Sequence, residues 1–214
     1  AALVARDQLV GMCTALINKI RGLAQTFGVV IGPGKRGSFD RAVREALPGD
    51  PLIDELFERR PATLGLPRAG QTSFDRQLSK IARDSRTCRL LMTLPGVGPP
   101  TALAFAGAVE DPSRFRRACD VGAYLGLTPG RCQAGDVDIG GRISKCGDRL
   151  MRRLLFEAAT VILYRTRGDC WLRAWAKARA GSWKARVALA RKRATILFRM
   201  MRDGTSFERG AVVA

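Results

Sequence analysis

Apolar residues recur every three or four positions near the start of this 214-residue chain, and this spacing is the feature that most constrains its fold. Spacings of four and three alternate, which places the side chains on one face of a long helix. Gly28 follows the last of them and ends the pattern. The members of this first stripe are Leu9, Cys13, Leu16, Ile20, Leu23 and Phe27.

A second stripe with the same spacing consists of Phe74, Leu78, Ile81, Ser85 and Cys88. Together the stripes predict a helical arm over residues 1–90, folded as an antiparallel pair of helices. The arm either forms an intramolecular core or dimerises as a coiled coil. The intramolecular core is favoured, because each stripe is short for a coiled coil. Shorter helices are expected at 38–47 and from Pro51, and a loop is expected at 61–70.

The remaining residues, 91–214, predict a second domain that begins with an uncharged run. The run extends over 20 residues, from Leu90 to Val109, and is long enough to span a bilayer. Pro95 to Pro100 lie in its centre and would break a membrane helix. The run therefore predicts a helix-hairpin-helix at 91–110 and no membrane partner.

Helical spacing returns after Asp148, where apolar residues predict a long amphipathic helix. A small loop or hairpin is expected before it, at 127–142, because this stretch is rich in glycine. Two further helices are expected at 169–180 and 183–202. The predicted fold class is therefore mainly α, with a helical arm followed by an all-α domain.

Positive charge dominates the composition, with 37 Lys and Arg against 19 Asp and Glu and a formal net charge of +18. Two-thirds of the excess lies in residues 131–214, which hold 19 basic and 7 acidic residues. Such an imbalance indicates a polyanionic partner, and nucleic acid is the first candidate. The asymmetry predicts that the C-terminal part binds it.

Histidine is absent from the chain, which excludes Ser-His and Cys-His nucleophile pairs, a histidine general base and a histidine-ligated metal. The six cysteines include no Cys-x-x-Cys pair, so no metal site is expected in this chain. Nothing at the start resembles a secretory signal, and the reducing cytoplasm is the expected location.

The hairpin at Gly96, Val97 and Gly98 is the first candidate binding element. Glycines leave the backbone N–H groups at the start of the following helix open to a phosphate. Such a contact would hold a sugar-phosphate backbone without reading its sequence. The alternative is that the hairpin only packs two helices together.

A serine among cations, at 140–153, is the second candidate. Ser144 could attack a phosphodiester while nearby cations stabilise the negative charge that phosphoryl transfer spreads over the phosphate. Cys146 is a rival nucleophile without a base. In the structural alternative, Ser144 or Asp148 caps the helix and the arginines form a solvated face. The cations are Arg142, Lys145, Arg149, Arg152 and Arg153.

Tryptophans near the end of the chain alternate with basic residues, as in proteins that stack bases on aromatic rings. Trp171 and Trp175 lie at helical spacing, so they could instead anchor a helix to the core. The sequence leaves both interpretations open.

Several segments together resemble a known family. The matching stretches are 14–23 in the arm, 94–99 in the hairpin, 124–129, 141–150 around the serine, and 184–207. They are similar to insertion-sequence transposases that join an N-terminal RuvC-like domain with a DEDD acidic set to a C-terminal serine-containing domain. These transposases are related to pilin-gene invertases.

The resemblance implies that Ser144 is the nucleophile of DNA cleavage and strand exchange. It also implies a structured guide RNA, the bridge RNA, and a homo-oligomer assembled through the helical arms. No position here matches the DEDD set, so Mg²⁺ is expected on a RuvC-like half that this chain lacks. The chain departs from the family at Gly130, Cys132 and Phe198, where an arginine, an aromatic residue and a histidine are frequent.

The expected function is therefore that of a DNA transposase or recombinase domain in a mobile element, inactive as this chain alone. The alternative is a non-catalytic nucleic-acid-binding or assembly fragment that remained after loss of the RuvC-like half.

Overall fold

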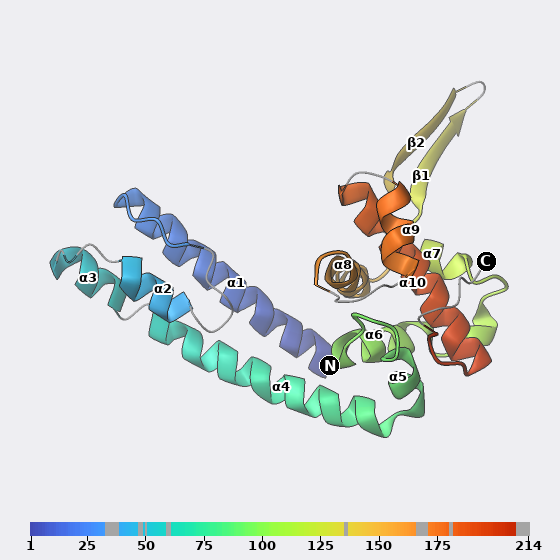
Figure 1. The fold of residues 1–214 in the computed structure, drawn as a ribbon, viewed down its shortest axis with the longest axis horizontal. Coiled ribbons are helices and arrows are strands. Elements are labelled where there is room, and N and C mark those ends of the chain that lie inside the picture. The colour runs from blue at the N-terminus through green and yellow to red at the C-terminus, as the bar shows by residue number, and fades with distance from the viewer. Residues whose placement is uncertain are drawn as a thin grey trace. The chain divides into compact units, whose positions relative to one another are not determined.

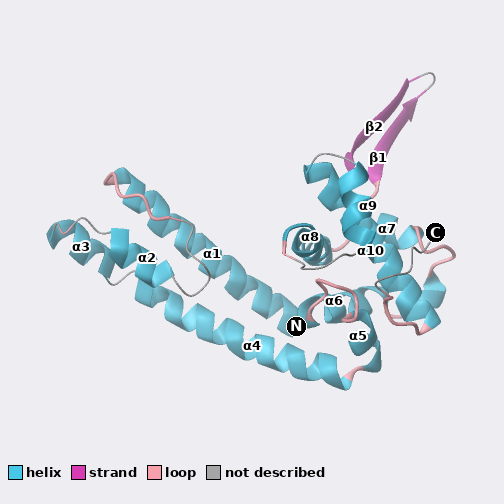
Figure 2. Cartoon of the chain, viewed as in Figure 1, coloured by secondary structure: helices cyan, strands magenta, loops and turns pink. Residues whose placement is uncertain are grey.

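The computed structural model describes residues 1–32, 39–46, 49, 51–58, 61–134, 137–165, 171–179 and 182–208. The chain divides into two compact units, Ala1–Gln77 and Leu78–Ala214. Helices make up most of both units (Figure 1, Figure 2), which confirms the mainly α fold class.

The first unit is built on two long helices, α1 (Ala2–Thr26) and the first part of α4 (Gly65–Asp84). They run antiparallel, as predicted (Figure 1): Arg6 Nε donates to Asp75 Oδ1 at 2.9 Å, and Leu9 packs over Gly70 one turn further along. A Cβ atom on Gly70 would lie 3.0 Å from the Leu9 side chain, so the glycine allows the two helices to approach closely.

Short helices complete the core of the first unit at the far end of α1. These are α2 (Phe39–Ala46), α3 (Pro51–Glu58) and the 3-10 helix η1 (Pro61–Leu64). Both α2 and α3 were expected from the sequence. Ile20 of the first stripe and the nearby Ala24 face this core, where they join Phe39, Phe57 and Leu64.

Two expectations for this region are wrong. Residues 61–70 form η1 and the start of α4 rather than a loop. Pro67 is compatible with α4 because it lies in the first turn, where backbone N–H groups have no partner within the helix. The second stripe is divided between two helices, since Ser85 adopts an extended backbone and caps α5 (Arg86–Leu91). Its hydroxyl accepts from Cys88 N at 3.2 Å, and Ile81 remains 50% exposed.

The second unit surrounds α10 (Ser182–Asp203), whose neighbours among the described elements include α5, α6 (Pro99–Val109), η2 (Pro112–Arg114), α7 (Asp120–Tyr124), α8 (Arg149–Tyr164) and α9 (Trp171–Arg179). The uncharged run at 90–109 contains the end of α5, a turn and α6, so the prediction of two short helices is confirmed. Leu94, Phe105, Leu155, Leu189 and Phe198 are buried between these helices.

An antiparallel pair of strands precedes α8. β1 (Pro129–Ala134) pairs with β2 (Val137–Ile143), and the register shifts between Pro129 and Arg131. The small hairpin expected at 127–142 is therefore present. Figure 1 shows the pair extending away from the helices of the second unit.

Arg193 of α10 joins three elements in the interior of the second unit. Its guanidinium is fully buried, and Nη1 donates to the Pro95 carbonyl at 2.8 Å and to the Ala158 carbonyl of α8 at 3.2 Å. Burying a guanidinium is costly unless carbonyls or anions accept its hydrogen bonds. The contact therefore fixes the turn between α5 and α6 against both α8 and α10.

Gly96 allows this close approach. It has a φ of +78°, which favours glycine, and a Cβ atom there would lie 2.9 Å from the Ala158 carbonyl oxygen and 3.4 Å from Arg193 Nη1. No other residue type fits this turn without displacing α8 or Arg193.

Among the described helices, none is both long enough and apolar enough to cross a bilayer.

We expect Gly96→Ala to lower the free energy of unfolding by about 1–3 kcal/mol, because it adds a left-handed alanine and a clash with α8. Gly107→Ala is the matched control, since Gly107 lies in α6 with nothing within 4 Å of the added carbon. The control should be neutral or stabilising by up to about 1 kcal/mol. Urea denaturation measures both, and equal effects would contradict this account of the turn.

Candidate nucleic-acid interface

Ser144 lies on a short loop between β2 and α8, residues 144–148, which we name the serine loop. The backbone N–H of Ser144 donates to the Thr128 carbonyl at 2.9 Å, and that of Lys145 donates to the Gly126 carbonyl at 3.2 Å. The serine loop is therefore paired with residues 124–128, which comprise the last residue of α7 and the segment after it.

Two glycines make this pairing close. Gly126 has a φ of +66° and Gly147 a φ of +74°. A Cβ atom on Gly126 would overlap the Cys146 carbonyl, and one on Gly147 would overlap the Tyr124 carbonyl. Lys145 itself has a φ of +57°, a conformation that costs a non-glycine residue about 1–3 kcal/mol. The surrounding contacts hold this strained backbone in place.

Asp148, and not Ser144, caps α8. Its Oδ1 accepts from Leu150 N at 2.7 Å and from Met151 N at 3.3 Å. Ser144 is exposed, and within the described part of the chain no hydrogen bond to its hydroxyl is formed. Of the two capping alternatives, the structure therefore assigns the cap to Asp148 and leaves the Ser144 hydroxyl facing solvent.

Arg152 connects the serine loop to its neighbour. Its Nη1 donates to the carbonyls of Cys146, of Gly147 at 2.9 Å and of Leu125 at 3.4 Å. The side chain thus binds backbone carbonyls on both paired segments. Sequence reasoning placed Arg152 beside the serine but missed this use of its guanidinium, since backbone carbonyl positions have no signature in the sequence.

The other two arginines at the start of α8 differ from Arg152. Arg149 is exposed. Arg153 Nε lies 3.7 Å from Glu157 Oε1, one turn later on α8. This is an ordinary i,i+4 ion pair, in agreement with the structural alternative for this arginine.

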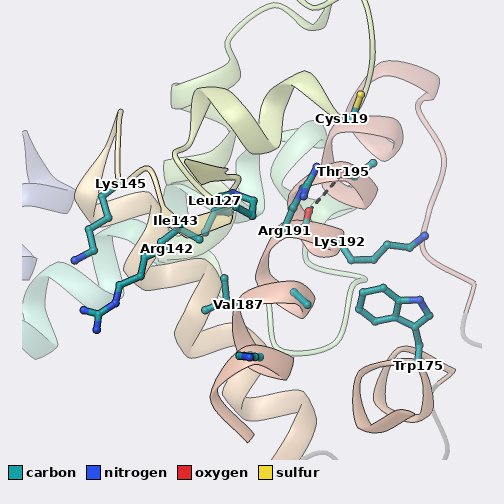
Figure 3. Close-up of a pocket in the computed structure, with 14 residues that line it drawn as sticks. Cys119, Leu127, Arg142, Ile143, Lys145, Trp175, Val187, Arg191, Lys192 and Thr195 are labelled. Carbon is teal, nitrogen blue, oxygen red and sulfur yellow. Dashed lines mark hydrogen bonds between the residues drawn. The ribbon is translucent and has the colours of Figure 1, made fainter. Parts of the chain in front are cut away.

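A groove of about 1370 Å³, which we name the cationic groove, lies beside the serine loop. Its lining includes Leu127, Ile143 and Val187 as apolar members, and Trp175 at one end (Figure 3). None of the described lining residues is acidic. Five cations line it: Arg142, Lys145, Lys184, Arg191 and Lys192.

None of these five cations forms an ion pair with any carboxylate in the described ranges. Asp120, which follows the groove residue Cys119, instead lies 3.1 Å from Arg117. The hydrogen bond from Arg117 holds the pKa of the Asp120 carboxyl below its usual value. The positive charge of the groove is therefore not compensated by the carboxylates that the structure describes.

The groove contains three of the residues singled out from the sequence, Arg142, Lys145 and Trp175, and adds Arg191 and Lys192. A signal for Arg191 exists, because Lys184, Arg191 and Thr195 recur at spacings of seven and four, which places them on one face of α10.

Gly96, Val97 and Gly98 lie elsewhere in the second unit. Gly96 faces Ala158, which is nine residues, or about 14 Å, along α8 from Arg149. The Val97 side chain is buried, and its N–H donates to the Leu94 carbonyl at 3.1 Å. The α5–α6 turn and the serine loop are thus separate places, and the phosphate contact at the turn stays a prediction.

Trp171 and Trp175 lie against other side chains of the protein, and base stacking on them stays a prediction. Trp171 stacks on Phe207, with ring centroids 6.4 Å apart, and so packs within the protein. Lys192 Nζ lies 5.9 Å from the Trp171 ring and 5.8 Å from the Trp175 ring. Only Trp175 of the two also lines the groove.

Comparison with known proteins shows what the second unit resembles. Residues 88–176 match the sequence profile of the Transposase IS116/IS110/IS902 family. This range includes the α5–α6 turn, the serine loop, α8 and most of α9.

Similarity to individual proteins extends over almost the whole chain. The transposase for insertion sequence element IS1111A of Coxiella burnetii is 30% identical over 99% of this chain and 60% of its own length. The transposase for insertion sequence element IS1328 of Yersinia enterocolitica is 32% identical over 95% of this chain and 63% of its own length. The chain therefore spans about three-fifths of the length of these relatives, which are insertion-sequence transposases. Its residues 88–176 carry the similarity to the IS116/IS110/IS902 family.

Proposed function

We propose that this chain is part of a DNA transposase that cleaves and exchanges strands through Ser144. The observation that carries the proposal is the position of Ser144, exposed on a loop whose neighbours Arg142 and Lys145 line the cationic groove. Similarity to insertion-sequence transposases supports DNA as the substrate.

In the proposed step, the Ser144 oxygen forms an ester bond to the phosphorus of a DNA phosphodiester. The bond from phosphorus to the leaving sugar oxygen breaks, the serine loses its proton, and the leaving oxygen gains one. The phosphoserine link keeps the energy of the broken ester for rejoining the strand. No redox partner is needed, because the step exchanges one phosphate ester for another.

The cations have different roles in this proposal. Arg142 and Lys145 are exposed and flank Ser144, so they would contact the phosphate oxygens directly. Arg149 is exposed at the first position of α8 and would extend this contact. Arg152 is a positioning residue, because its guanidinium holds the loop carbonyls.

Two further elements would contact DNA at positions other than Ser144. Arg153 follows Arg152 on α8, and its Nε lies 3.7 Å from Glu157 Oε1. The backbone at Gly96 to Gly98 would contact a sugar-phosphate backbone, as the sequence predicts.

The resemblance also implies magnesium. Among the described residues, no group of three His, Cys, Asp or Glu could hold a metal ion, so these residues do not fit magnesium. The proposal assigns the metal to a RuvC-like half, and no step above passes through it. Guide-RNA binding and inactivity of this chain alone remain expectations of the same proposal.

Assembly through the helical arm completes the proposal. Val4 and Met12 on α1 are 55% and 52% exposed. A second copy of the chain would cover them.

The second candidate is a nucleic-acid-binding or assembly fragment without catalysis. The uncompensated cationic groove favours it, since binding there does not require Ser144. DNA cleavage by the 214-residue chain in the presence of magnesium would exclude this candidate.

The serine assignment predicts a covalent intermediate. With the complete protein, its RNA and a suicide DNA substrate, the native sequence should form an adduct that survives denaturing electrophoresis. Ser144→Ala should abolish the adduct, whereas the matched control Cys146→Ala should retain it. An adduct that persists in Ser144→Ala, or that disappears only in Cys146→Ala, would refute the assignment.

The charge distribution predicts that the affinity of this chain for DNA falls steeply as the salt concentration rises. Lys and Arg side chains that bind phosphates displace counterions from the DNA, and added salt opposes this release. For duplex DNA, the slope of log K against log salt should be about −0.9 for each phosphate contacted. A titration of labelled duplex at several salt concentrations measures it. Binding that does not change with salt would mean that the basic residues are not the binding surface.

A further inference from the structure

The cationic groove joins two kinds of surface in the second unit. Cations lie toward both ends, with Arg142 and Lys145 at one and Lys192 beside Trp175 at the other (Figure 3). Between them the lining includes Leu127, Ile143 and Val187. A ligand that fits both surfaces must carry repeated negative charge and flat apolar groups.

We propose that the cationic groove binds an unpaired DNA strand, with phosphates on the cations and bases on the apolar surface. This inference rests on the proposed function, because strand exchange by a transposase leaves DNA strands transiently unpaired. It adds the form of DNA bound, the residues that bind it, and a place separate from the Ser144 hydroxyl.

The apolar surface favours a single strand over a duplex. A duplex buries its base faces in its own stack and presents phosphates and groove edges, so apolar residues would gain little from it. Unpaired bases expose faces that stack on aromatic and apolar side chains in basic grooves. Leu127 is buried beneath the groove, whereas Ile143, Trp175 and Val187 are partly exposed and present the apolar surface.

The size of the groove favours a chain over a small molecule. Its volume of about 1370 Å³ exceeds the range of about 300–1,000 Å³ that is usual for small-ligand sites. Its five cations, with no acidic lining residue among those described, would also be excessive for a single phosphate. A segment of several nucleotides accounts for both.

One end of the groove is built in advance. Lys192 is held over two indole rings, at 5.9 Å from Trp171 and 5.8 Å from Trp175, and Trp171 stacks in turn on Phe207. Cation–π contacts of this kind restrict the position of the ammonium group. A phosphate beside Lys192 would bring the adjoining base near the Trp175 ring.

Lys145 at the opposite end and Arg191, which Figure 3 shows nearer to Lys192, are also held in place. Lys145 lies in the paired serine loop, and the stem of Arg191 packs over Gly122, where an added Cβ would lie 3.2 Å from the arginine side chain. Both residues are exposed overall, so their charged ends remain accessible. The groove therefore presents its cations from an ordered scaffold, which reduces the entropic cost of binding a strand.

Fluorescence anisotropy of the 214-residue chain with labelled oligonucleotides of about 12 nucleotides tests the proposal. The probes are a single DNA strand, the duplex of the same sequence, and the single RNA strand of the same sequence. We expect the DNA strand to bind more tightly than either of the others. Tighter binding of the duplex overturns the single-strand assignment, and RNA binding as tight as that of DNA overturns the choice of DNA.

The groove variant carries Lys184→Gln, Arg191→Gln and Lys192→Gln. Its matched control carries Lys19→Gln, Lys80→Gln and Arg86→Gln, which removes the same charge from exposed positions outside the groove. We expect the groove variant to weaken DNA-strand binding about tenfold or more and to reduce the salt slope by about 2, for three lost contacts. Equal effects of the two variants would overturn the groove as the site.

Photocross-linking gives a second readout that does not depend on the fold of a variant. A DNA strand that contains 5-iododeoxyuridine should cross-link to peptides that line the groove, from 127–129, 141–145, 171–179 or 184–195. Cross-links confined to other peptides would refute the proposal. These experiments measure binding without cleavage, so a negative result would not affect the assignment of Ser144 as the nucleophile. If adduct formation instead refuted that assignment, the binding results would still hold.

Discussion

The buried guanidinium of Arg193 is the interaction on which the second unit depends. One side chain of α10 reaches the carbonyl of Pro95 in the α5–α6 turn and that of Ala158 in α8, and Gly96 leaves the space for it. Alanines at 190 and 194 are fully buried on the same helix, which lets α10 lie close to its neighbours. The outer face of α10 is thereby fixed, and that face carries Lys184, Arg191 and Lys192 into the cationic groove.

A second set of contacts fixes the reactive candidate. The serine loop pairs with residues 124–128 through two backbone hydrogen bonds, two left-handed glycines permit the contact, and Arg152 holds carbonyls on both sides. Asp148 supplies the helix cap, so Ser144 is not needed for it. The side chains that hold the serine loop in place are thus different from that of Ser144 itself. This division supports our proposal that Ser144 acts on DNA while Arg152 positions it.

Periodic patterns predicted most of the fold but little of the site. The helices at 2–26 and 149–164 followed from apolar spacing, because burial of one face repeats every turn. The same rule was wrong at Ser85, where one capping side chain restarted the helix. The loop expected from proline and glycine at 61–70 was also wrong, because prolines there lie at the start of helices. The groove escaped prediction because it joins α10 to residues about 50 positions earlier, and Arg193 looked like one more surface cation.

The central claim is that Ser144 becomes bonded to DNA beside a groove that holds a strand. The most direct measurement is mass spectrometry of peptides from a trapped protein–DNA adduct formed by the complete protein, with the nucleotide remnant located by fragmentation. The account predicts that the remnant is a phosphate ester on Ser144. A remnant on Cys146, or on any residue outside the serine loop, would contradict it.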